Sequence, residues 1–388
     1  MKVFIAGIDG YLGWPLALYL NARGHSVAGI DNGYRRLLVR EMGGGTITPI
    51  QGPIKRKNFA RNMGIEFEMG DACGSMVDRF KKFKPDAIVH LAEIPSAPYS
   101  MAGFGECWLT FINNSKTTLN ILWAMKDVCP EAHLVKLGTM GEYGTPDIDI
   151  PEGHFPVEFR NRLAMLPFPR QPGSFYHATK CADSINVELA CKLWGLRSTD
   201  VMQGVVFGTR TDEMGNNEKL LTRFDIDECF GTAINRFCAQ AVIEHPITVY
   251  GKGMQKRGFI PLRDSMQCLG IAIENPPEAG EYRVFNQFEG TYTLVSLARR
   301  VERIGASLGL KTEINYIENP RIEEEKHYYN PDCKELPRLG YRPTRAVTRE
   351  ITSVLQDLMK YKDRIEKFKD RLIPEVRWDG TKRKSERL

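Results

Sequence analysis

Three glycines stand three residues apart directly after a short apolar run at the start of the chain. The run Val3–Ala6 has the length and composition of a buried β-strand, and Gly7, Gly10 and Gly13 follow it at once. The residues after Gly13 show a helical period. Glycine at such a junction permits a tight turn and lets a bound group approach the backbone closely. The sequence therefore predicts that the fold begins with a strand, a glycine-rich turn and a helix.

The first half of the chain alternates short apolar runs with longer amphipathic segments, which is typical of βα units that share a parallel sheet. We expect strands at Val3–Ala6, Ser26–Ile30, Ile65–Met69, Ala87–Leu91, His133–Leu137 and Ser198–Met202. We expect long helices at Trp108–Val128 and from Tyr176 to about Trp194. The predicted fold is a Rossmann-type, doubly wound α/β domain over residues 1–204 that binds a dinucleotide.

After Gly204 the expected elements become shorter, and residues 205–388 are predicted to form mainly a smaller α/β domain for the substrate, with later strands returning to the first sheet. The expected helices are Thr232–Ile243, Asp264–Glu274 and Leu294–Ser307, and the expected strands are Thr248–Tyr250, Gly258–Ile260, Tyr282–Asn286 and Glu313–Ile317. Residues 147–173 contain five prolines and no clear period, so we expect a long loop that acts as a lid.

The composition excludes several classes of protein. The formal charge is +5 over 388 residues, and the basic residues are scattered apart from a tail at 382–387, so no nucleic-acid partner is expected. The nine cysteines form no Cys-x-x-Cys pair, which predicts free thiols in a reducing compartment and no metal site. No run approaches the ~18 apolar residues of a membrane span. Because the first strand begins at Lys2 and leaves no room for a targeting peptide, we expect a soluble, cytoplasmic protein.

An acidic residue ends the second predicted strand. Asp31 comes 18 residues after Gly13, where a carboxylate accepts hydrogen bonds from the hydroxyls of an adenosine ribose while the glycine turn holds the pyrophosphate. This predicts NAD, because the carboxylate repels the 2′-phosphate of NADP. Arg35 and Arg36 leave NADP open as an alternative. Asp71, after the third strand, is expected to contact the adenine, to cap the next helix, or both.

A tyrosine and a lysine lie four positions apart further along the chain. On the predicted helix, Tyr176 and Lys180 share one face. A lysine ammonium beside a phenol favours the phenolate, so we expect the pKa of Tyr176 to fall below its usual value of about 10. Such a tyrosine accepts a proton when an alcohol is oxidised by hydride transfer. The pair therefore predicts a dehydrogenation step.

The glycine turn, the strand end at Gly138-Thr139 and the Tyr176/Lys180 pair together resemble the extended short-chain dehydrogenase/reductase superfamily. The resemblance implies oxidation of a nucleotide-sugar hydroxyl by bound NAD, and a homodimer. It implies that Thr139 hydrogen-bonds the reacting oxygen, that Tyr176 is the base and that Lys180 holds the nicotinamide ribose. The implied cofactor contacts are Gly7, Gly10, Tyr11, Leu12, Gly13, Asp31, Asn32, Arg35, Arg36, Asp71, Ala72, Leu91, Ala92, Glu93, Asn114, Tyr176 and Lys180.

The residues after Thr139 distinguish among the reactions of this superfamily. Nucleotide-sugar 4,6-dehydratases place an Asp-Glu pair directly after the threonine, whereas this chain has Met140 and Gly141 before the single carboxylate of Glu142. The resemblance therefore disfavours a simple dehydratase. A 4-epimerase needs only the threonine, the tyrosine and the lysine, so it stays open. A non-catalytic NAD-binding protein on the same fold is a further alternative, which the intact threonine, tyrosine and lysine disfavour.

Five longer blocks resemble the UDP-sulfoquinovose synthase family more closely. They are Ser96–Met101, Lys136–Pro146, Thr248–Gly253, Val284–Phe288 and His327–Asn330. The resemblance implies conversion of UDP-glucose and sulfite into UDP-sulfoquinovose, through C4 oxidation, loss of the C6 hydroxyl, addition of sulfite and return of the hydride. Plastid members carry Gln-Arg before the first block, where this chain has Ile94-Pro95. If that arginine contacts sulfite, this chain uses another cation.

The same resemblance implies roles around the sugar. Glu142 or His177 removes the C5 proton, and the alternatives are a structural ion pair for Glu142 and an exposed helix face for His177. Met140 forms an uncharged wall beside C6 or simply packs in the interior. Arg257 and Arg321 bind the diphosphate through bidentate, charge-assisted hydrogen bonds. The full set of implied substrate contacts is Tyr99, Thr139, Gln203, Arg236, Val249, Gln255, Arg257, Arg321 and Glu323.

Overall fold

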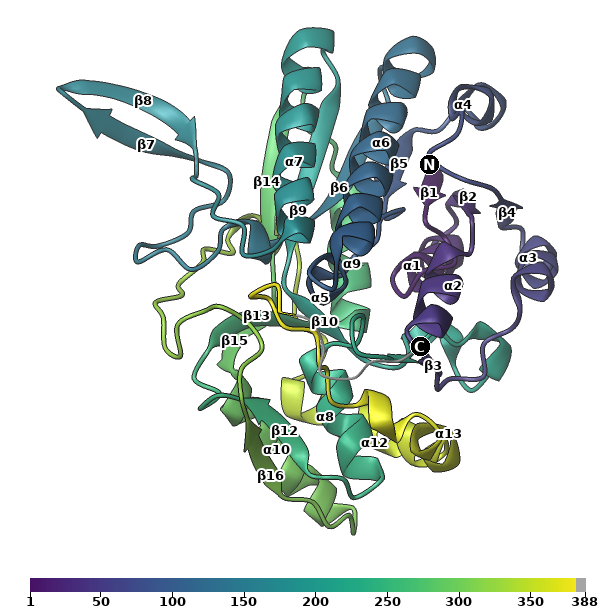
Figure 1. Ribbon diagram of the computed structural model, residues 1–388. Helices are drawn as coiled ribbons and strands as arrows, with labels where there is room; N and C mark the ends of the chain where they lie inside the picture. The colour runs from purple at the N-terminus through teal and green to yellow at the C-terminus, as the bar shows by residue number, and fades with distance from the viewer. Residues whose placement is uncertain (382–388) are drawn as a thin grey trace.

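Seven parallel strands form the central sheet of the computed structural model, in which residues 1–381 are described (Figure 1). Their order across the sheet is β14, β9, β6, β5, β1, β2 and β4. The strands span Lys2–Ala6 (β1), Ser26–Asp31 (β2), Glu66–Met69 (β4), Ala87–His90 (β5), His133–Thr139 (β6), Arg197–Gln203 (β9) and Tyr282–Gln287 (β14). The chain adds strands on both sides of β1, so the strand order reverses between β1 and β5, where sheets of this kind bind ligands at their carboxyl ends. The predicted Rossmann-type sheet is confirmed.

Helices cover both faces of this sheet, with α6 and α7 in front of it in Figure 1. The covering helices are α1 (Gly13–Ala22), α4 (Val77–Phe83), α6 (Phe104–Val128), α7 (Phe175–Trp194) and α9 (Leu262–Glu274). Residues of β1 alternate between the two faces. Val3 and Ile5 belong to the core that α1 and α9 cover, whereas Phe4 and Ala6 belong to the core under α4, α6 and α7. Burial on both faces explains why the strands are continuous apolar runs.

The later part of the chain builds a second, mainly helical core, which lies below the sheet in Figure 1. Its elements are the helices α8 (Ala233–Val242), α10 (Leu294–Ser307) and α12 (Val347–Met359), and the parallel pair β12 (Ile247–Tyr250) and β16 (Ile314–Ile317). A three-stranded sheet adjoins it, in the order β10 (Val205–Phe207), β13 (Lys256–Pro261) and β15 (Gly290–Thr293). From this half of the chain, β14 crosses to the first sheet and pairs with β9. The division of the chain at residue 204 stays a prediction.

The expected lid at residues 147–173 is instead an antiparallel hairpin of β7 (His154–Phe159) and β8 (Arg162–Pro167). The hairpin projects away from the body of the molecule (Figure 1), and every residue of β8 is exposed. Arg160 and Asn161 form its turn with φ of 50° and 59°, the left-handed conformation that a two-residue hairpin turn needs. At its base, His154 Nε2 lies 3.0 Å from Glu188 Oε1 on α7. The loop prediction is therefore wrong.

Several short elements have bounds that the sequence analysis did not give, although a helical segment was expected after each strand of the first half. They are α2 (Tyr34–Glu41), β3 (Gly45–Thr46), α3 (Pro53–Asn62), α5 (Ala97–Ser100), β11 (Asp225–Ile226), α11 (Glu335–Arg338) and α13 (Lys362–Glu366), with single 3-10 turns at Met140–Glu142, Asp212–Met214, Glu218–Leu220 and Lys369–Arg371. The basic tail at 382–387 lies outside the described residues. Within residues 1–381, no helix combines the length and the apolar character that crossing a bilayer requires.

We expect Phe285→Ala to lower the free energy of unfolding by about 3–5 kcal/mol, the usual cost of deleting a buried aromatic ring. Phe285 lies on β14 and is fully buried in the core that α1 and α9 cover. The matched control is Ile54→Ala on α3, which removes a side chain that is 72% exposed and should change stability by less than about 0.5 kcal/mol. Denaturant titration followed by circular dichroism measures both. Equal effects would contradict the burial of β14 in the sheet.

Candidate active site

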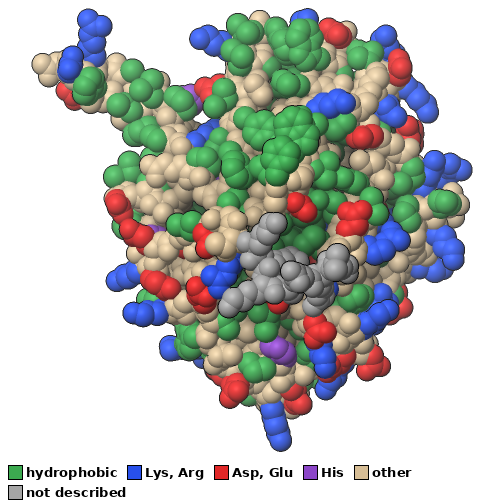
Figure 2. Space-filling view, viewed as in Figure 1, with side chains coloured by type: hydrophobic (Ala, Val, Ile, Leu, Met, Phe, Trp, Pro, Cys, Tyr) green, Lys and Arg blue, Asp and Glu red, His purple; other side chains and the backbone are tan. Residues whose placement is uncertain are grey.

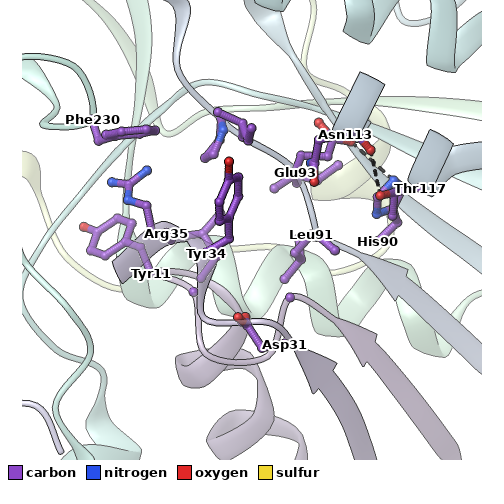
Figure 3. Close-up of a pocket in the computed structure, with 18 of the residues that line it drawn as sticks. Tyr11, Asp31, Tyr34, Arg35, His90, Leu91, Glu93, Asn113, Thr117 and Phe230 are labelled. Atoms are coloured by element: carbon purple, nitrogen blue, oxygen red, sulfur yellow. Dashed lines mark hydrogen bonds and ion pairs between the residues drawn. The ribbon is translucent and has the colours of Figure 1, made fainter. Parts of the chain in front are cut away.

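A cavity of about 320 Å³ runs along the carboxyl ends of the sheet strands (Figure 3). Thr139, Tyr176 and Lys180 line its β6 side. Asp31 and Asp71 line it on the opposite side of the sheet, where β2 and β4 end. An elongated cavity at the switch point of a doubly wound sheet is where such folds bind a dinucleotide.

The glycine turn between β1 and α1 is fixed by its packing. Gly7 has a φ of +91°, and a Cβ there would lie 2.7 Å from the backbone carbonyl of Leu91. A Cβ on Gly13 would lie 2.0 Å from the carbonyl oxygen of Gly7. Gly10, between them, lines the cavity. The backbone of α1 therefore begins at the cavity wall without side chains in the way, which fits the pyrophosphate of a dinucleotide.

The carboxylate of Asp31 stands at the end of β2, as predicted. Its oxygens accept hydrogen bonds from the backbone N–H of Asp9 at 3.0 Å and of Gly33 at 2.7 Å. Burial, and next the nearby Asp9 carboxylate, raise the pKa of Asp31 to about 6. Asp31 is thus a rigid acceptor at the cavity wall, in the position suited to ribose hydroxyls.

Arg35 and Arg36, whose positions made NADP an alternative to NAD, both form ion pairs with carboxylates of this chain. Arg36 forms hydrogen bonds of 2.5 and 2.9 Å with Asp9 and does not line the cavity, so the structure does not support its predicted cofactor contact. Arg35 lines the cavity, but its guanidinium pairs with Asp225 at 3.0 Å. That guanidinium also lies 3.7 Å from the ring centroid of Phe230 (Figure 3). Neither arginine is free to bind a 2′-phosphate, which favours NAD.

The structure excludes the helix-cap alternative for Asp71, whose adenine contact stays a prediction, and it places Asn114 away from the cavity. Asp71 lines the cavity, but its carboxylate accepts a hydrogen bond from the N–H of Cys73 at 2.8 Å, and α4 begins only after Met76. Asp71 therefore shapes a turn and does not cap the next helix. Asn114 is fully buried behind the cavity, where its side chain accepts a hydrogen bond from the N–H of Ile94 at 2.9 Å. It positions the segment after β5 and does not line the cavity.

The strand end and the helix predicted to hold the reacting residues do converge. Thr139 ends β6, and its Oγ1 accepts a hydrogen bond from the N–H of Gly141 at 3.1 Å. Tyr176 is the second residue of α7, which Ser174 caps by accepting from the N–H of His177 at 3.2 Å. Lys180 follows one turn later. The hydroxyls of a threonine and a tyrosine and a lysine ammonium thus share one side of the cavity.

The electrostatics of Tyr176 differ from the prediction. Burial raises its pKa well above 10, and the carboxylate of Glu93 is the next largest cause. The ammonium of Lys180, expected to favour the phenolate, is instead paired with Glu93 and donates to the carbonyl of Leu137. The predicted direction of the pKa shift is therefore wrong, because burial disfavours the phenolate and Glu93, predicted only as a cofactor contact, adds a negative charge beside it.

Glu142 takes the structural role that stood as its alternative. Its side chain has no exposed surface and pairs with Arg170 and, at 3.5 Å, with the ammonium of Lys136. It also accepts a hydrogen bond of 3.2 Å from the N–H of Thr139. Glu142 does not line the cavity, so it holds the turn after β6 and does not face the sugar.

His177 is the other candidate for the C5 proton. Its Nδ1 lies 3.1 Å from the Ser174 hydroxyl, and a Cβ added to Gly141 would lie 2.4 Å from its Nε2, so the ring edge faces the turn that follows Thr139. Burial, then the positive charges of Arg321 and Arg257, lower its pKa to about 3. The ring is therefore neutral and half-buried, which excludes the exposed-face alternative.

Several predicted substrate residues are interior. Met140 packs with Tyr143 and Phe168 in a small apolar cluster and does not line the cavity, so packing is its role. Val249 and Gln255 have no exposed surface. Tyr99 is 5% exposed and stacks on Phe230, with 5.4 Å between ring centroids. Side-chain contacts between these four residues and a substrate in the cavity are not supported.

The predicted diphosphate arginines lie on the second half of the chain. Arg257 on β13 pairs with Glu323 and lies 2.6 Å from His327 Nε2. The guanidinium of Arg321 lies 4.9 Å from the ring centroid of Trp378. Both contribute to the electrostatic field at His177, which places them on the Tyr176 side of the molecule. Glu323 serves as a partner of Arg257, so its predicted contact with ribose stays a prediction.

Of the predicted residues, those that line the cavity are Gly7, Gly10, Tyr11, Leu12, Gly13, Asp31, Asn32, Arg35, Asp71, Ala72, Leu91, Ala92, Glu93, Thr139, Tyr176, Lys180 and Gln203. Arg236 does not, because its guanidinium bonds Tyr250 and the Thr248 carbonyl. The sequence did not point to several lining residues: His90, Asn113, Thr117 and Phe230. Asn113 and Thr117 stand four apart on α6, and that spacing was the available signal.

We expect Asp31→Asn to weaken NAD binding while stabilising the protein at neutral pH. Because the pKa of Asp31 rises from 3.8 to about 6 on folding, the protein loses stability as the pH rises through that window. The variant avoids this loss, so it should gain about 1–3 kcal/mol at pH 8 and nothing below pH ~4. Thermal unfolding across pH and calorimetric NAD titration measure both effects. A variant less stable than the parent at pH 8 would contradict the shift.

Comparison with known proteins supplies the family. Residues 3–286 match the model of the NAD dependent epimerase/dehydratase family. The chain is 46% identical to the UDP-sulfoquinovose synthase of Sulfolobus acidocaldarius over 384 residues, which cover 97% of this chain and 98% of the relative. It is 45% identical to the chloroplastic UDP-sulfoquinovose synthase of Spinacia oleracea, over 97% of this chain and 79% of that protein.

Solved structures agree on the fold. A UDP-glucose 4-epimerase from Thermotoga maritima superposes with a TM-score of 0.69 at 18% identity, over 93% of this chain and 99% of that one. A UDP-glucuronic acid 4-epimerase from Bacillus cereus, solved with UDP-glucuronic acid and NAD, gives 0.68 at 19% identity with the same coverage. The chain therefore belongs to the NAD-dependent epimerase/dehydratase family and, within it, to the UDP-sulfoquinovose synthases.

Proposed function

We propose that this protein converts UDP-glucose and sulfite into UDP-sulfoquinovose by transient oxidation at C4. The observation that carries the proposal is the convergence of Thr139, Tyr176 and Lys180 with the glycine turn on one cavity, in a chain that is 46% identical to a UDP-sulfoquinovose synthase. The net reaction exchanges the C6 hydroxyl for a sulfonate and releases water. NAD, when bound, supplies the acceptor for the C4 hydride and gives the hydride back at the end.

The residues at the β6 side of the cavity handle the C4 hydroxyl. The hydroxyl of Thr139 and the phenol of Tyr176 hydrogen-bond the sugar oxygen, and Tyr176 takes its proton as the C–H bond breaks. Lys180 stabilises the charge that develops on Tyr176. The same groups return the proton in the last step. The resulting 4-ketone acidifies the neighbouring C5 proton, which permits loss of the C6 hydroxyl.

His177 is the base that the structure favours for the C5 proton, since Glu142 is enclosed in ion pairs. Burial, and then the positive charges of Arg321 and Arg257, lower the pKa of His177. The substrate diphosphate, bound to these arginines, offsets that charge and raises the basicity of His177 only when substrate is present. Sulfite then adds through sulfur to C6 of the alkene, and His177 returns the proton to C5. Ile94 and Pro95 line the cavity where plastid relatives carry Gln-Arg, so they offer sulfite no cation.

Incubation of the purified protein with NAD, UDP-glucose and sulfite, followed by mass spectrometry, tests the proposal. The expected product is heavier than UDP-glucose by one SO2, and its formation should depend on sulfite. Tyr176→Phe should lower turnover by at least about a hundredfold, because it removes the acid–base group. Unchanged mass with UDP-galactose as product would identify a 4-epimerase instead. Full turnover by the Tyr176→Phe protein would contradict the assigned role.

We also propose a homodimer formed through α6 and α7. Their outer faces carry ten exposed large apolar side chains: Phe104, Trp108, Phe111, Ile112, Leu119, Trp123, Phe175, Ile185, Leu189 and Leu193. Figure 2 shows apolar side chains gathered over these helices. Together they expose on the order of 1,000 Å², comparable to the ~800 Å² per partner of a stable interface. A solvent-facing helix normally carries a polar outer face, so a second copy is the fitting cover.

The double substitution Ile185→Glu and Leu189→Glu should convert the dimer into monomer, because each places an unpaired carboxylate inside the interface. Sedimentation equilibrium measures the association constant. Ile54→Glu, on the exposed side of α3, is the control and should leave association unchanged. A double variant that still sediments as a dimer would place the interface elsewhere.

A reducing, cytoplasmic location is proposed from the thiols. Within residues 1–381, Cys181, Cys191, Cys238 and Cys268 are buried free thiols, which is typical of proteins in a reducing compartment.

A further inference from the structure

A buried carboxylate stands beside the reacting lysine without a conventional hydrogen bond. The side chain of Glu93, just after β5, is 3% exposed and forms an ion pair with Lys180. Among the described residues, neither of its carboxylate oxygens has a hydrogen-bond partner of acceptable geometry. His90 lies beside Glu93, and Asn113 and Thr117 of α6 line the same cavity (Figure 3). A buried carboxylate without a hydrogen bond costs free energy. The side chain of Glu93 is therefore suited to a second positively charged partner in addition to Lys180.

The charges around Glu93 leave it the dominant anion of this part of the cavity. His90 Nε2 lies 3.5 Å from Glu93 Oε1, but burial and the charges of Lys180 and Lys136 lower the pKa of His90 well below its usual value, so the ring is neutral. Asp183, also buried, has its pKa raised to about 7 by burial and by Glu93. Glu93 and Lys180 therefore form an ion pair beside a neutral imidazole.

We propose that Glu93 stabilises the oxidised form of the bound cofactor, NAD⁺, over NADH. Glu93 lines the cavity on the same side as Tyr176 and Lys180, so the inference rests on the proposed role of those residues at the hydride-transfer site. The nicotinamide ring is cationic in NAD⁺ and neutral in NADH. A carboxylate in a poorly solvated cavity attracts the cationic ring strongly and the neutral ring weakly.

This preference suits a reaction that must end by giving the hydride back. The positive charge of Lys180 alone would disfavour a cationic ring and hold the cofactor in its reduced form. Glu93 offsets that charge. It thereby favours the state in which the ring is oxidised and the sugar has regained its C4 hydrogen. Burial raises the pKa of Tyr176, and the charge of Glu93 adds to that effect.

Calorimetric titration of NAD⁺ and of NADH into Glu93→Gln at pH 6 tests the proposal. Glutamine keeps the shape and removes the charge. The Kd for NAD⁺ should rise by at least about tenfold while that for NADH changes less than about twofold, since every tenfold change reflects 1.4 kcal/mol of lost attraction. A tenfold change in the ratio is a shift of about 30 mV in the two-electron potential of the bound cofactor. Equal changes in both Kd values, or none, would overturn the proposal.

Two variants separate charge from structure. Glu93→Asp keeps the charge and should retain the preference for NAD⁺. Asp183→Asn alters the other buried carboxyl near Lys180, which does not line the cavity, so it should change the ratio much less than Glu93→Gln does. A ratio that shifts as far in Asp183→Asn as in Glu93→Gln would overturn the assignment to Glu93. The titrations contain no UDP-glucose or sulfite, so their outcome is independent of the sulfonation assay.

Discussion

A buried lysine holds the reacting end of the site together. Lys136 in β6 has no exposed surface, and its ammonium lies 3.2 Å from Asp200 on β9 and 3.5 Å from Glu142. The hydroxyl of Ser184 on α7 lies within 3.0 Å of both carboxylates. Removing one member would leave uncompensated buried charge, at a cost of about 3–5 kcal/mol. The turn that carries Thr139 is therefore fixed to β9 and to α7, and the threonine and the tyrosine meet because of it.

A second charge pair, between Lys180 and Glu93, determines the net charge on the Tyr176 side of the cavity. Lys180 lies on the same helix as Ser184, and Glu93 reaches it from the end of β5. The first network fixes where the groups stand, and the pair with Glu93 determines how much positive charge Tyr176 and a bound nicotinamide experience. An enzyme that oxidises its substrate transiently and then returns the hydride needs both features: a rigid site for the sugar oxygen and a cofactor that returns to its oxidised form.

The sequence predicted the parts of the site that depend on local rules. A glycine turn after a strand, an acid at the end of the next strand and a tyrosine four residues before a lysine each follow from one segment of the backbone. The Glu93–Lys180 pair and the ion pair of Glu142 with Arg170 join distant segments of the chain. The spacing of residues within one segment therefore cannot predict them. The hairpin was missed for another reason. Pro156 and Pro167 argue against strands in general, yet strands with a free edge tolerate them.

Transient oxidation at C4 is tested most directly by the fate of the hydrogen on that carbon. UDP-glucose that carries deuterium at C4 can be supplied with sulfite, and the product can be examined by NMR. If the hydride leaves C4 and returns within one active site, UDP-sulfoquinovose retains the deuterium at C4 even when unlabelled cofactor is present in excess. Loss of the deuterium to solvent or to free cofactor would contradict the mechanism.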